Sequence, residues 1–383
     1  MLTKRSSAKF WIALVIFSLV GQVAWVVENM YLNVFIYKMF NADPEAISSM
    51  VSASAISATV TTLLVGALSD KIGKRKIIIC AGYICWGISI LSFALIRMDV
   101  ISALFPAVAQ AASVGVTLVI IMDCVMTFFG SAANDAAFNA WLTDSTDETN
   151  RGAAEGINSM MPLVAILCVF GGFMGLDQNL SESWTVIFCV IGGVVLVLGV
   201  AGFFLIKEPQ VHTEGNQNYF ANLFYGFRPG VIRENSKLYL TLLAYAVFNI
   251  AIQIFMPYLI LYYTEALGMD NYVLVFAPAI ILAAAFTAFY GRVYDKKGFG
   301  PAVITPIVLL MAGFVVLYFF RDTAPVFIGT VIMLCGYLSG MAILAQCCGT
   351  TPRKARPVCS RVSGSSDRCW CPALSARQSA RLC

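Results

Sequence analysis

Three acidic side chains lie inside long apolar stretches of the sequence: Glu28, Asp123 and Asp135. A charged side chain at the centre of a membrane helix costs about 2.5 to 3.5 kcal/mol, so acids at such positions are rare and usually functional. Buried carboxylates of this kind bind cations or pass protons. We therefore expect these three residues to form a path for protons or sodium ions.

Amides, hydroxyls and aromatic rings recur at helical spacing around these acids. Residues three, four, seven or eleven apart share one face of a helix. Three such faces are Gln22, Asn29, Asn33 and Tyr37; Asp123, Thr127, Asn134 and Trp141; and Tyr245, Asn249 and Gln253. These groups suit a ligand with many hydroxyls, which needs both donors and acceptors. The alternative is that individual amides only join neighbouring helices.

The segments that carry these residues are long enough to cross a bilayer, which takes about 20 apolar residues. Of the 383 residues, 59% are hydrophobic and 12% are charged, whereas a soluble domain has about 25% charged residues. We expect ten helices, near residues 10–37, 46–68, 77–96, 114–142, 152–175, 185–206, 238–264, 272–292, 302–320 and 325–345. The sequence thus predicts an all-α polytopic membrane protein.

The composition argues against several other classes of protein. The net charge of +4 arises in residues 347–383, where seven basic residues face the single acid Asp367, so no nucleic-acid surface is expected. His212 is the only histidine, and no P-loop of the form G-x-x-x-x-G-K-[ST] occurs. We therefore expect no enzyme activity, no primary pumping, no cofactor and no metal site.

A short charged segment follows the second apolar stretch: Gly66-Ala-Leu-Ser-Asp70-Lys71-Ile-Gly73-Lys74-Arg75-Lys76. It predicts a tight loop in which Gly66 lets two helices approach closely and Gly73 adopts a positive φ. Asp70 can accept hydrogen bonds from a helix N-terminus. The form G-x-x-x-D-K-x-G-K-R-K resembles the signature loop of the major facilitator superfamily, which joins helices 2 and 3 on the cytoplasmic side. The alternative is a basic loop that only sets topology.

A second copy of this pattern lies 225 residues later, at Gly291-Arg-Val-Tyr-Asp295-Lys296-Lys297-Gly298. Tyr31-Leu32 and Tyr258-Leu259 form another pair, with an offset of 227. The resemblance implies an inverted-repeat bundle of two related halves, as is common in transporters. We expect a six-helix half over 1–206, a cytoplasmic linker over 207–237 and a half cut short to four helices over 238–346.

The remaining residues, 347–383, are rich in Arg, Ser and Cys and look like sequence translated out of frame. We expect this aberrant tail to be disordered. A Cys-rich metal-binding tail is the alternative, but the tail has no C-x-x-C pair.

A second charged block, Asp144 to Arg151-Gly152, resembles the corner between helices 4 and 5 of the same superfamily. The resemblance implies a charge network in which Asp144 pairs with Lys74 or Arg75, and Arg151 with Asp70 or Glu155. Such pairs can hold a gate shut in one conformation. A capped, solvated helix start at Ser145 or Thr146 is the alternative.

The stretch from Asn134 to Thr143 is loosely similar to helix 4 of the glycoside-pentoside-hexuronide cation symporters, which suggests a sugar as solute. The resemblance implies a secondary transporter of a small polar solute that works by alternating access and is coupled to protons or sodium. We expect a monomer in the cytoplasmic membrane. An inactive truncated product and an exporter of drug-like solutes remain open.

The positive-inside rule gives the orientation. With the N-terminus inside, three basic residues before the tail lie in segments that face outward, namely Lys38, Arg97 and Arg321. Fifteen face inward: Lys4, Arg5, Lys9, Lys71, Lys74, Arg75, Lys76, Arg151, Lys207, Arg228, Arg233, Lys237, Arg292, Lys296 and Lys297.

Overall fold

The computed structural model describes residues 8–105, 108–147, 150–208, 228–269, 271–297 and 299–350, and every regular element within these ranges is a helix. Ten helical segments in this part are long and apolar enough to cross a membrane. Six of them end by Leu205 and four follow. The predicted polytopic fold with a six-plus-four arrangement is therefore confirmed.

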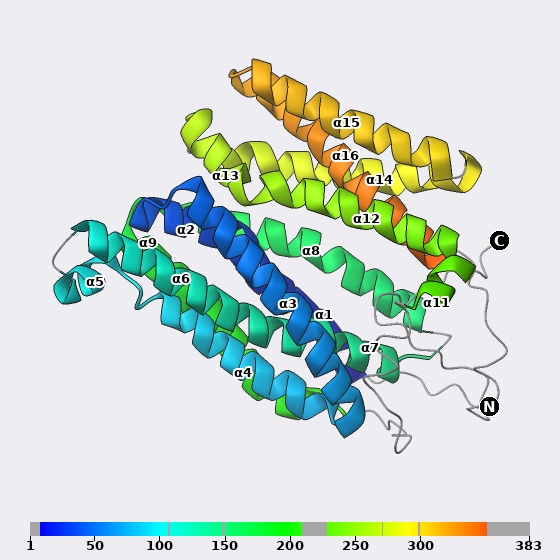
Figure 1. Ribbon diagram of the computed structural model, residues 1–383, viewed down its shortest axis with the longest axis horizontal. Coiled ribbons are helices and arrows are strands. Elements are labelled where there is room, and N and C mark those ends of the chain that lie inside the picture. Colours follow the sequence, from blue (N-terminus) through cyan, green and yellow to red (C-terminus); the bar gives the residue numbers. More distant parts are fainter. Residues whose placement is uncertain are drawn as a thin grey trace. The chain divides into compact units, whose positions relative to one another are not determined.

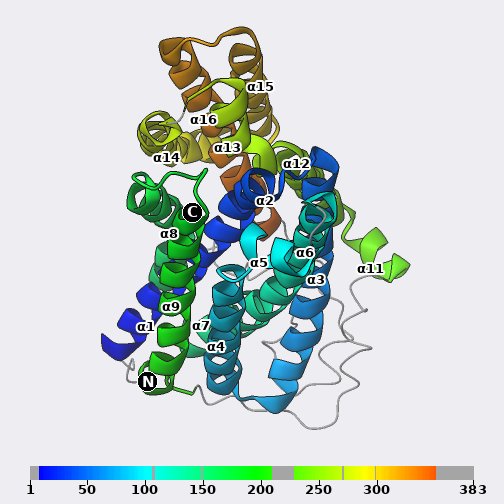
Figure 2. The same ribbon diagram turned by 90° about the vertical axis from the view of Figure 1, so that its left-hand side faces the viewer.

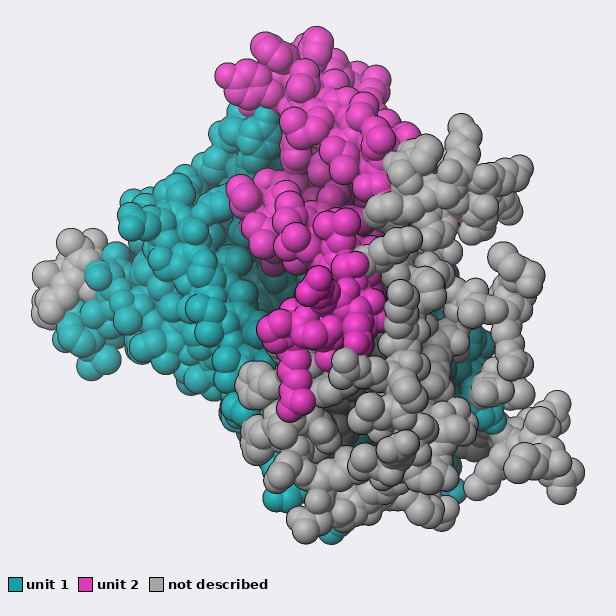
Figure 3. All heavy atoms as spheres, turned by 45° about the vertical axis from the view of Figure 1, so that its right-hand side comes forward, with its two compact units in different colours: residues 1–215, 256–266 teal, residues 216–255, 267–383 magenta. Residues whose placement is uncertain are grey.

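Contacts divide the chain into two units, which Figure 3 colours separately. Unit 1 is Met1–Gly215 together with Met256–Ala266, and unit 2 is Asn216–Phe255 together with Leu267–Cys383. The boundary at Gly215 falls inside the expected linker. The assignment of Met256–Ala266 to unit 1 was not expected, because this segment belongs to the seventh apolar stretch.

Unit 1 contains six spans, two of which change their helical type along their length. The first span is α1 (Ala8–Val26), η1 (Val27–Tyr31) and α2 (Leu32–Phe40), and the fourth is α6 (Val108–Gly130), η2 (Ser131–Phe138) and α7 (Asn139–Ser145). The others are α3 (Pro44–Ile72), α4 (Arg75–Phe93), α8 (Arg151–Phe173) and α9 (Ser181–Leu205), with the short α5 (Met98–Leu104) between α4 and α6. The segment Met256–Ala266 forms η4 (Met256–Tyr258), α13 (Leu259–Leu261) and η5 (Tyr262–Ala266).

Local sequence explains both ends of α3. Asp43 caps its start, because the Asp43 carboxylate accepts a hydrogen bond from the amide of Ala46 at 2.8 Å and Pro44 occupies the first turn. At the other end Gly73 has φ 67°, and its amide donates to the Ser69 carbonyl at 2.9 Å. The predicted positive φ of Gly73 is therefore confirmed.

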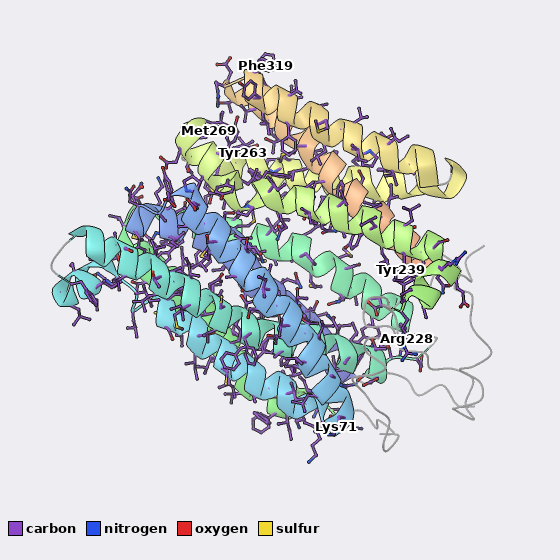
Figure 4. All side chains as sticks on the ribbon, viewed as in Figure 1. Lys71, Arg228, Tyr239, Tyr263, Met269 and Phe319 are labelled. Atoms are coloured by element: carbon purple, nitrogen blue, oxygen red, sulfur yellow. The ribbon has the colours of Figure 1, made fainter. Side chains whose placement is uncertain are left out.

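The expected loop of residues 66–76 is much shorter than predicted. Gly66 to Ile72 form the last two turns of α3, and α4 begins at Arg75, so only Gly73 and Lys74 connect the helices. The prediction placed the end of the helix where the apolar residues end. Backbone hydrogen bonds continue beyond that point, and Lys71 extends from this end of α3 (Figure 4).

Glycines allow α4 and α9 to pack side by side (Figure 2). A Cβ added to Gly87 of α4 would lie 2.5 Å from the backbone nitrogen of Leu196, and one added to Gly199 of α9 would lie 2.7 Å from that of Ile84. In a membrane the surrounding lipid is as apolar as the side chains, so no hydrophobic effect drives helices together. Helices there associate through close packing at small residues. The exposed apolar side chains of unit 1, such as Val197, form the surface that suits hydrocarbon.

Arg97 links the polar segment after α4 to two other elements. Its Nε lies 3.0 Å from Oδ1 of Asp99 at the start of α5, and its Nη2 lies 3.8 Å from Oε1 of Glu182 in the first turn of α9. The guanidinium beside it holds the pKa of the Asp99 carboxyl below its usual value. These three residues therefore form a small charged cluster outside the spans.

Unit 2 contains α11 (Pro229–Glu234), α12 (Ser236–Phe255), α14 (Tyr272–Lys297), α15 (Phe299–Phe319) and α16 (Thr323–Thr350). Helix α16 packs against α12, α14 and α15, and α15 runs beside it in Figure 1. The approach of α15 and α16 is again through glycine, since a Cβ on Gly336 would lie 2.4 Å from the backbone nitrogen of Leu310. Helix α16 continues past the expected boundary at residue 346, and residues 351–383 of the expected tail lie outside the described ranges.

Candidate functional site

Glu28 lies in the π-helical segment η1, where the first span departs from α-helical geometry. Single π-helical turns often mark functional positions. The side chain is buried, and its Oε1 accepts a hydrogen bond from the Thr127 hydroxyl of α6 at 2.7 Å. Its Oε2 is buried and has no hydrogen-bond partner among the described residues.

Asp123 lies one turn before Thr127 on α6 and is also buried. Its Oδ1 has no hydrogen-bond partner among the described residues, and the Ser54 hydroxyl of α3 faces the same carboxyl. Glu28 is close enough to Asp123 and to Asp135 for its charge to interact with each of them. Glu28 therefore links the three predicted acids into one cluster, since it lies near both of the others.

The π-helical segment η2 explains how Asp135 reaches this cluster. Asp123, Thr127, Ser131 and Asp135 are each four residues apart, and four residues advance about 40° beyond a full turn in an α-helix. The wider i→i+5 turn of η2, which starts at Ser131, rotates the chain less per residue and offsets that drift. Asp135 thus stays on the side of the span that carries Asp123.

The ion pairs among the described residues include none of these three acids. No group of three His, Cys, Asp or Glu side chains in the described ranges is arranged as a metal site. A buried carboxylate without a counter-ion is costly, so such a group is neutralised by a proton or accompanied by a cation. The arrangement can therefore bind a monovalent cation or hold a proton.

Asn134 is buried beside Asp135 and is held by α4. The Tyr83 hydroxyl of α4 lies 2.9 Å from Oδ1 of Asn134 and 3.0 Å from the Phe17 carbonyl of α1. The Asn134 Nδ2 lies 3.5 Å from Oδ1 of Asp135. Sequence reasoning missed Tyr83, because a tyrosine on a third helix carries no signal that it contacts these residues.

The expected polar face of the first span is divided by η1. Gln22 is half-buried on α1, Asn29 is exposed in η1 with its Nδ2 donating to the Trp25 carbonyl at 2.8 Å, and Asn33 is buried on α2. Asn33 donates to the Asn29 carbonyl at 2.6 Å, and its Oδ1 has no hydrogen-bond partner among the described residues. Of the three candidate amides on this span, Asn33 is thus the one whose buried side-chain oxygen has no described hydrogen-bond donor.

Trp141, a candidate for the solute cavity, is instead held by aromatic packing and by a hydrogen bond to the backbone. Its ring packs against Phe10 and Phe138, and its Nε1 donates to the Lys207 carbonyl at 3.0 Å. The side chain is buried, and its only polar atom already has a partner. This arrangement leaves no polar atom of Trp141 for a solute.

In unit 2, Asn249 and Gln253 lie on α12 as the periodicity predicts. Asn249 is half-buried, and its Nδ2 donates to the Tyr245 carbonyl at 2.8 Å. Gln253 is exposed. Their contribution to a solute cavity stays a prediction.

The charge network at the start of α4 joins several elements of unit 1. Arg75 is buried; its Nε lies 3.1 Å from Oδ2 of Asp144 on α7, and its Nη1 donates to the Ser69 hydroxyl at 2.5 Å. The expected pairing of Asp144 with Arg75 is therefore present. Lys74 is exposed, and the side chain of Asp70 lies outside what the structure describes.

Arg151 makes hydrogen bonds in addition to the expected proximity to Glu155, and Gly66 lacks its expected contact. Arg151 donates to the Thr146 hydroxyl at 3.2 Å and to the Thr143 carbonyl at 2.9 Å, while Glu155 lies near enough to attract its charge. A Cβ added to Gly66 would meet no described atom within 4 Å, so the expectation that Gly66 allows close approach of two helices is wrong. Within the part of the chain that the structure describes, no other helix contacts α3 at Gly66.

Glu208 is a member of this network that sequence reasoning missed. Its Oε1 and Oε2 lie 3.3 and 3.2 Å from the backbone nitrogen of Lys76, one of the free amides at the start of α4. Carboxylates are favoured at helix N-termini. The only signal in the sequence is an acid directly after the sixth apolar stretch.

The second copy of the charged pattern is helical over most of its length. Helix α14 continues through Gly291 and Asp295 to Lys297, and a Cβ on Gly291 would meet no described atom within 4 Å. The side chain of Asp295 and all of Gly298 lie outside the described residues. Their gating roles stay predictions.

Two contacts at the Phe40 end of the first span were not expected. Lys38 of α2 forms an ion pair with Glu265 of η5, and the Tyr258 hydroxyl of η4 donates to the Pro44 carbonyl at 2.7 Å. Lys38 and Glu265 are 227 residues apart, which is the offset between Tyr31 and Tyr258. The segments η1 and η4 end at Tyr31 and Tyr258, so both spans leave α-helical geometry at equivalent positions.

A family model described as Major Facilitator Superfamily matches residues 10–357 of the chain. Among curated proteins, none matches the sequence significantly. Among solved structures, a variant of the nucleoside transporter NupG aligns with a TM-score of 0.66 and 13% identity, covering 88% of this chain and 81% of that one.

A D-xylose-proton symporter aligns with a TM-score of 0.63 and 12% identity, covering 88% of this chain and 82% of that one. A bacterial homologue of the human lysosomal transporter Spinster, inward-facing and unoccupied, aligns with a TM-score of 0.59 and 15% identity over 89% of this chain and 76% of that one. At these identities the structures are similar to this chain in fold alone.

Proposed function

Because the chain belongs to the major facilitator superfamily, we propose that it is a secondary active transporter driven by a proton or sodium gradient. Its solute is a small polar molecule, with sugars and glycosides as the first class to test. It acts by alternating access as a monomer in the cytoplasmic membrane. The excess of basic residues on one side of the spans supports an N-terminus inside the cell.

The observation that carries the coupling is the pair of unpartnered carboxyl oxygens, Oε2 of Glu28 and Oδ1 of Asp123. Both are buried among apolar spans, and no described cation pairs with either group. A bound proton or sodium ion would lower the cost of holding two acids there. Asp135 extends the path along the fourth span.

Polar groups on the span that carries Glu28 support a solute that forms hydrogen bonds. The buried side-chain oxygen of Asn33 has no described partner, and Gln22 and Asn29 lie on the same span. The similarity in fold to a D-xylose-proton symporter and to a nucleoside transporter supports polyhydroxylated molecules as the first candidates. Asn249 and Gln253 would contribute the amides of the second half.

The contacts of Met256–Ala266 support alternating access. The ion pair between Lys38 and Glu265 and the bond from Tyr258 to Pro44 hold this segment against α2 and the start of α3. We name these contacts the outer clasp. The clasp closes the outer side in one conformation and breaks in the other, while the network of Arg75 and Asp144 serves the inner side.

Uptake into proteoliposomes tests the proposal. Purified protein is reconstituted, and the uptake of a panel of radiolabelled sugars and nucleosides is followed with a pH gradient, a sodium gradient or neither. At least one solute should accumulate above its external concentration under one gradient only. Equal accumulation with and without a gradient would contradict coupling, and vesicles that carry the double variant Glu28→Gln, Asp123→Asn provide the control.

A further inference from the structure

The hydroxyl of Tyr83 has two acceptors for one proton. Tyr83 is fully buried, and its oxygen lies 3.0 Å from the Phe17 carbonyl and 2.9 Å from Oδ1 of Asn134. A phenol donates one hydrogen bond but can also accept one. With both neighbours as acceptors, at least one of them lacks a full hydrogen bond.

Turning the Asn134 amide over resolves this shortage. The oxygen and nitrogen of an asparagine amide have nearly the same shape, so both orientations fit one site. In the turned orientation Nδ2 of Asn134 donates to Tyr83, and the Tyr83 proton goes to the Phe17 carbonyl alone. The side-chain oxygen of Asn134 then faces the Asp135 carboxyl. In the first orientation this place is taken by Nδ2 of Asn134, which lies 3.5 Å from Oδ1 of Asp135.

We propose that Tyr83 and Asn134 are positioning residues whose hydrogen bonds switch with the protonation of Asp135. When Asp135 is ionised, Nδ2 of Asn134 donates to it and Tyr83 shares its proton between two acceptors. When Asp135 has taken up a proton, its O–H donates to Oδ1 of Asn134, Nδ2 donates to Tyr83, and Tyr83 donates to Phe17. The proton on Asp135 is the only atom gained, and no other covalent bond changes.

The surroundings contain few other groups that could produce such a switch. Glu28 of η1 and Tyr83 of α4 face Asp135 closely enough to interact with its charge, and Asp123 of α6 faces Glu28. Helix α1 has no titratable residue from Phe10 to Val26, and α3 has none from Ala46 to Ser69. The inference rests on the proposed function only in placing Asp135 on the path of the coupling ion.

Gly21 makes room for this arrangement in α1. A Cβ added to Gly21 would lie 2.4 Å from Oδ1 of Asn134 and 2.8 Å from the Tyr83 hydroxyl oxygen. Real Cβ atoms do not approach so closely, so Gly21→Ala must displace both groups. Gly171 of α8 is a matched control, because a Cβ there would meet no described atom within 4 Å.

Infrared spectra of the purified full chain, recorded as a function of pH without any solute, test the switch. A protonated carboxyl gives a carbonyl stretching band, and the band that is missing from the spectrum of Asp135→Asn belongs to Asp135. Tyr83→Phe should move the midpoint of this band to lower pH by about half a unit to one unit, because Tyr83 makes two full bonds only in the protonated state. Tyr318→Phe, which removes an exposed hydroxyl, should leave it unchanged.

Gly21→Ala should shift the midpoint in the same direction as Tyr83→Phe, and Gly171→Ala should not. Coincident titrations of wild type and Tyr83→Phe would overturn the switch, as would the absence of any band assigned by Asp135→Asn. Because the spectra need no solute, their outcome is separate from that of the uptake assay. Failure of transport with an intact Tyr83 effect would reject the proposed function and keep the switch.

Discussion

At the residue scale, the proposed coupling depends on two buried acids that form no ion pair with any described residue. The Thr127 hydroxyl satisfies one oxygen of Glu28, but Oε2 of Glu28 and Oδ1 of Asp123 remain without described partners. In a protein built for stability alone, such groups would be paired or replaced by apolar side chains. The proposed coupling ion, which enters and leaves, would explain why both acids lack a described partner.

Neutralising either acid should separate accumulation from exchange. Glu28→Gln and Asp123→Asn should each lower gradient-driven accumulation at least tenfold, because the driving ion loses its site, while exchange of labelled for unlabelled solute continues. Both rates are measured in proteoliposomes at equal protein content. Asp99→Asn, which changes an exposed acid outside the spans, should affect neither rate. Concentrative uptake by both buried-acid variants would leave Asp135 as the coupling residue.

At the element scale, helix type and helix ends place these residues. The segments η1 and η2 carry Glu28 and Asp135 toward one cluster, and Gly73 ends α3 so that Arg75 can start α4 in contact with Asp144. A left-handed residue ends the helix within one position. The geometry of this corner therefore depends on Gly73 far more than on Gly66.

Alanine at two glycine positions should affect stability differently. Gly73→Ala should destabilise unit 1 by about 1 to 2 kcal/mol, because alanine is strained at a φ of 67°. Gly66→Ala should be neutral or stabilise by up to about 1 kcal/mol, because Gly66 lies inside α3 and an added Cβ would meet no described atom within 4 Å. Thermal unfolding in detergent gives both values. A loss for Gly66→Ala as large as that for Gly73→Ala would mean that Gly66 contacts another helix after all.

The positions of the membrane spans, and the contacts made within short sequence motifs, could be predicted from the sequence. Hydropathy predicted the ten spans, and the motif predicted the turn at Gly73. The resemblance of the Asp144 block implied that Asp144 pairs with Lys74 or Arg75, of which the structure shows Arg75. The π-helical segments could not be predicted, because their residues have ordinary helical propensities and the wider turn is decided by packing. Tyr83 and Glu265 were missed for a related reason, since their partners lie on helices distant in the sequence.

At the scale of the whole molecule, the outer clasp joins equivalent positions of the two repeats. Lys38 and Glu265 are separated by 227 residues, the same offset as Tyr31 and Tyr258, at which the non-α turns η1 and η4 end. Opposite charges at repeat-related positions attract, whereas two copies of one charge would repel. Under the proposed alternating access, the clasp would thus let a duplicated chain close one side.

Exchanging the clasp charges tests its role. Lys38→Glu and Glu265→Lys should each slow uptake several-fold, because like charges then oppose closure, and the double exchange should restore most of the rate. A similar exchange at Arg97 and Asp99, an ion pair outside the spans, should change uptake little. Additive losses in the double variant would show that the two clasp residues act independently.

The central claim is that solute and cation cross together, and simultaneous recording of both fluxes tests it most directly. Proteoliposomes containing the wild-type chain are given an external solute with no imposed gradient, while internal pH, internal sodium and labelled solute are followed. Addition of the solute should start an inward flux of protons or sodium in fixed proportion to solute uptake, and this flux should be absent with Asp123→Asn. Solute entry that brings neither ion with it would contradict the account.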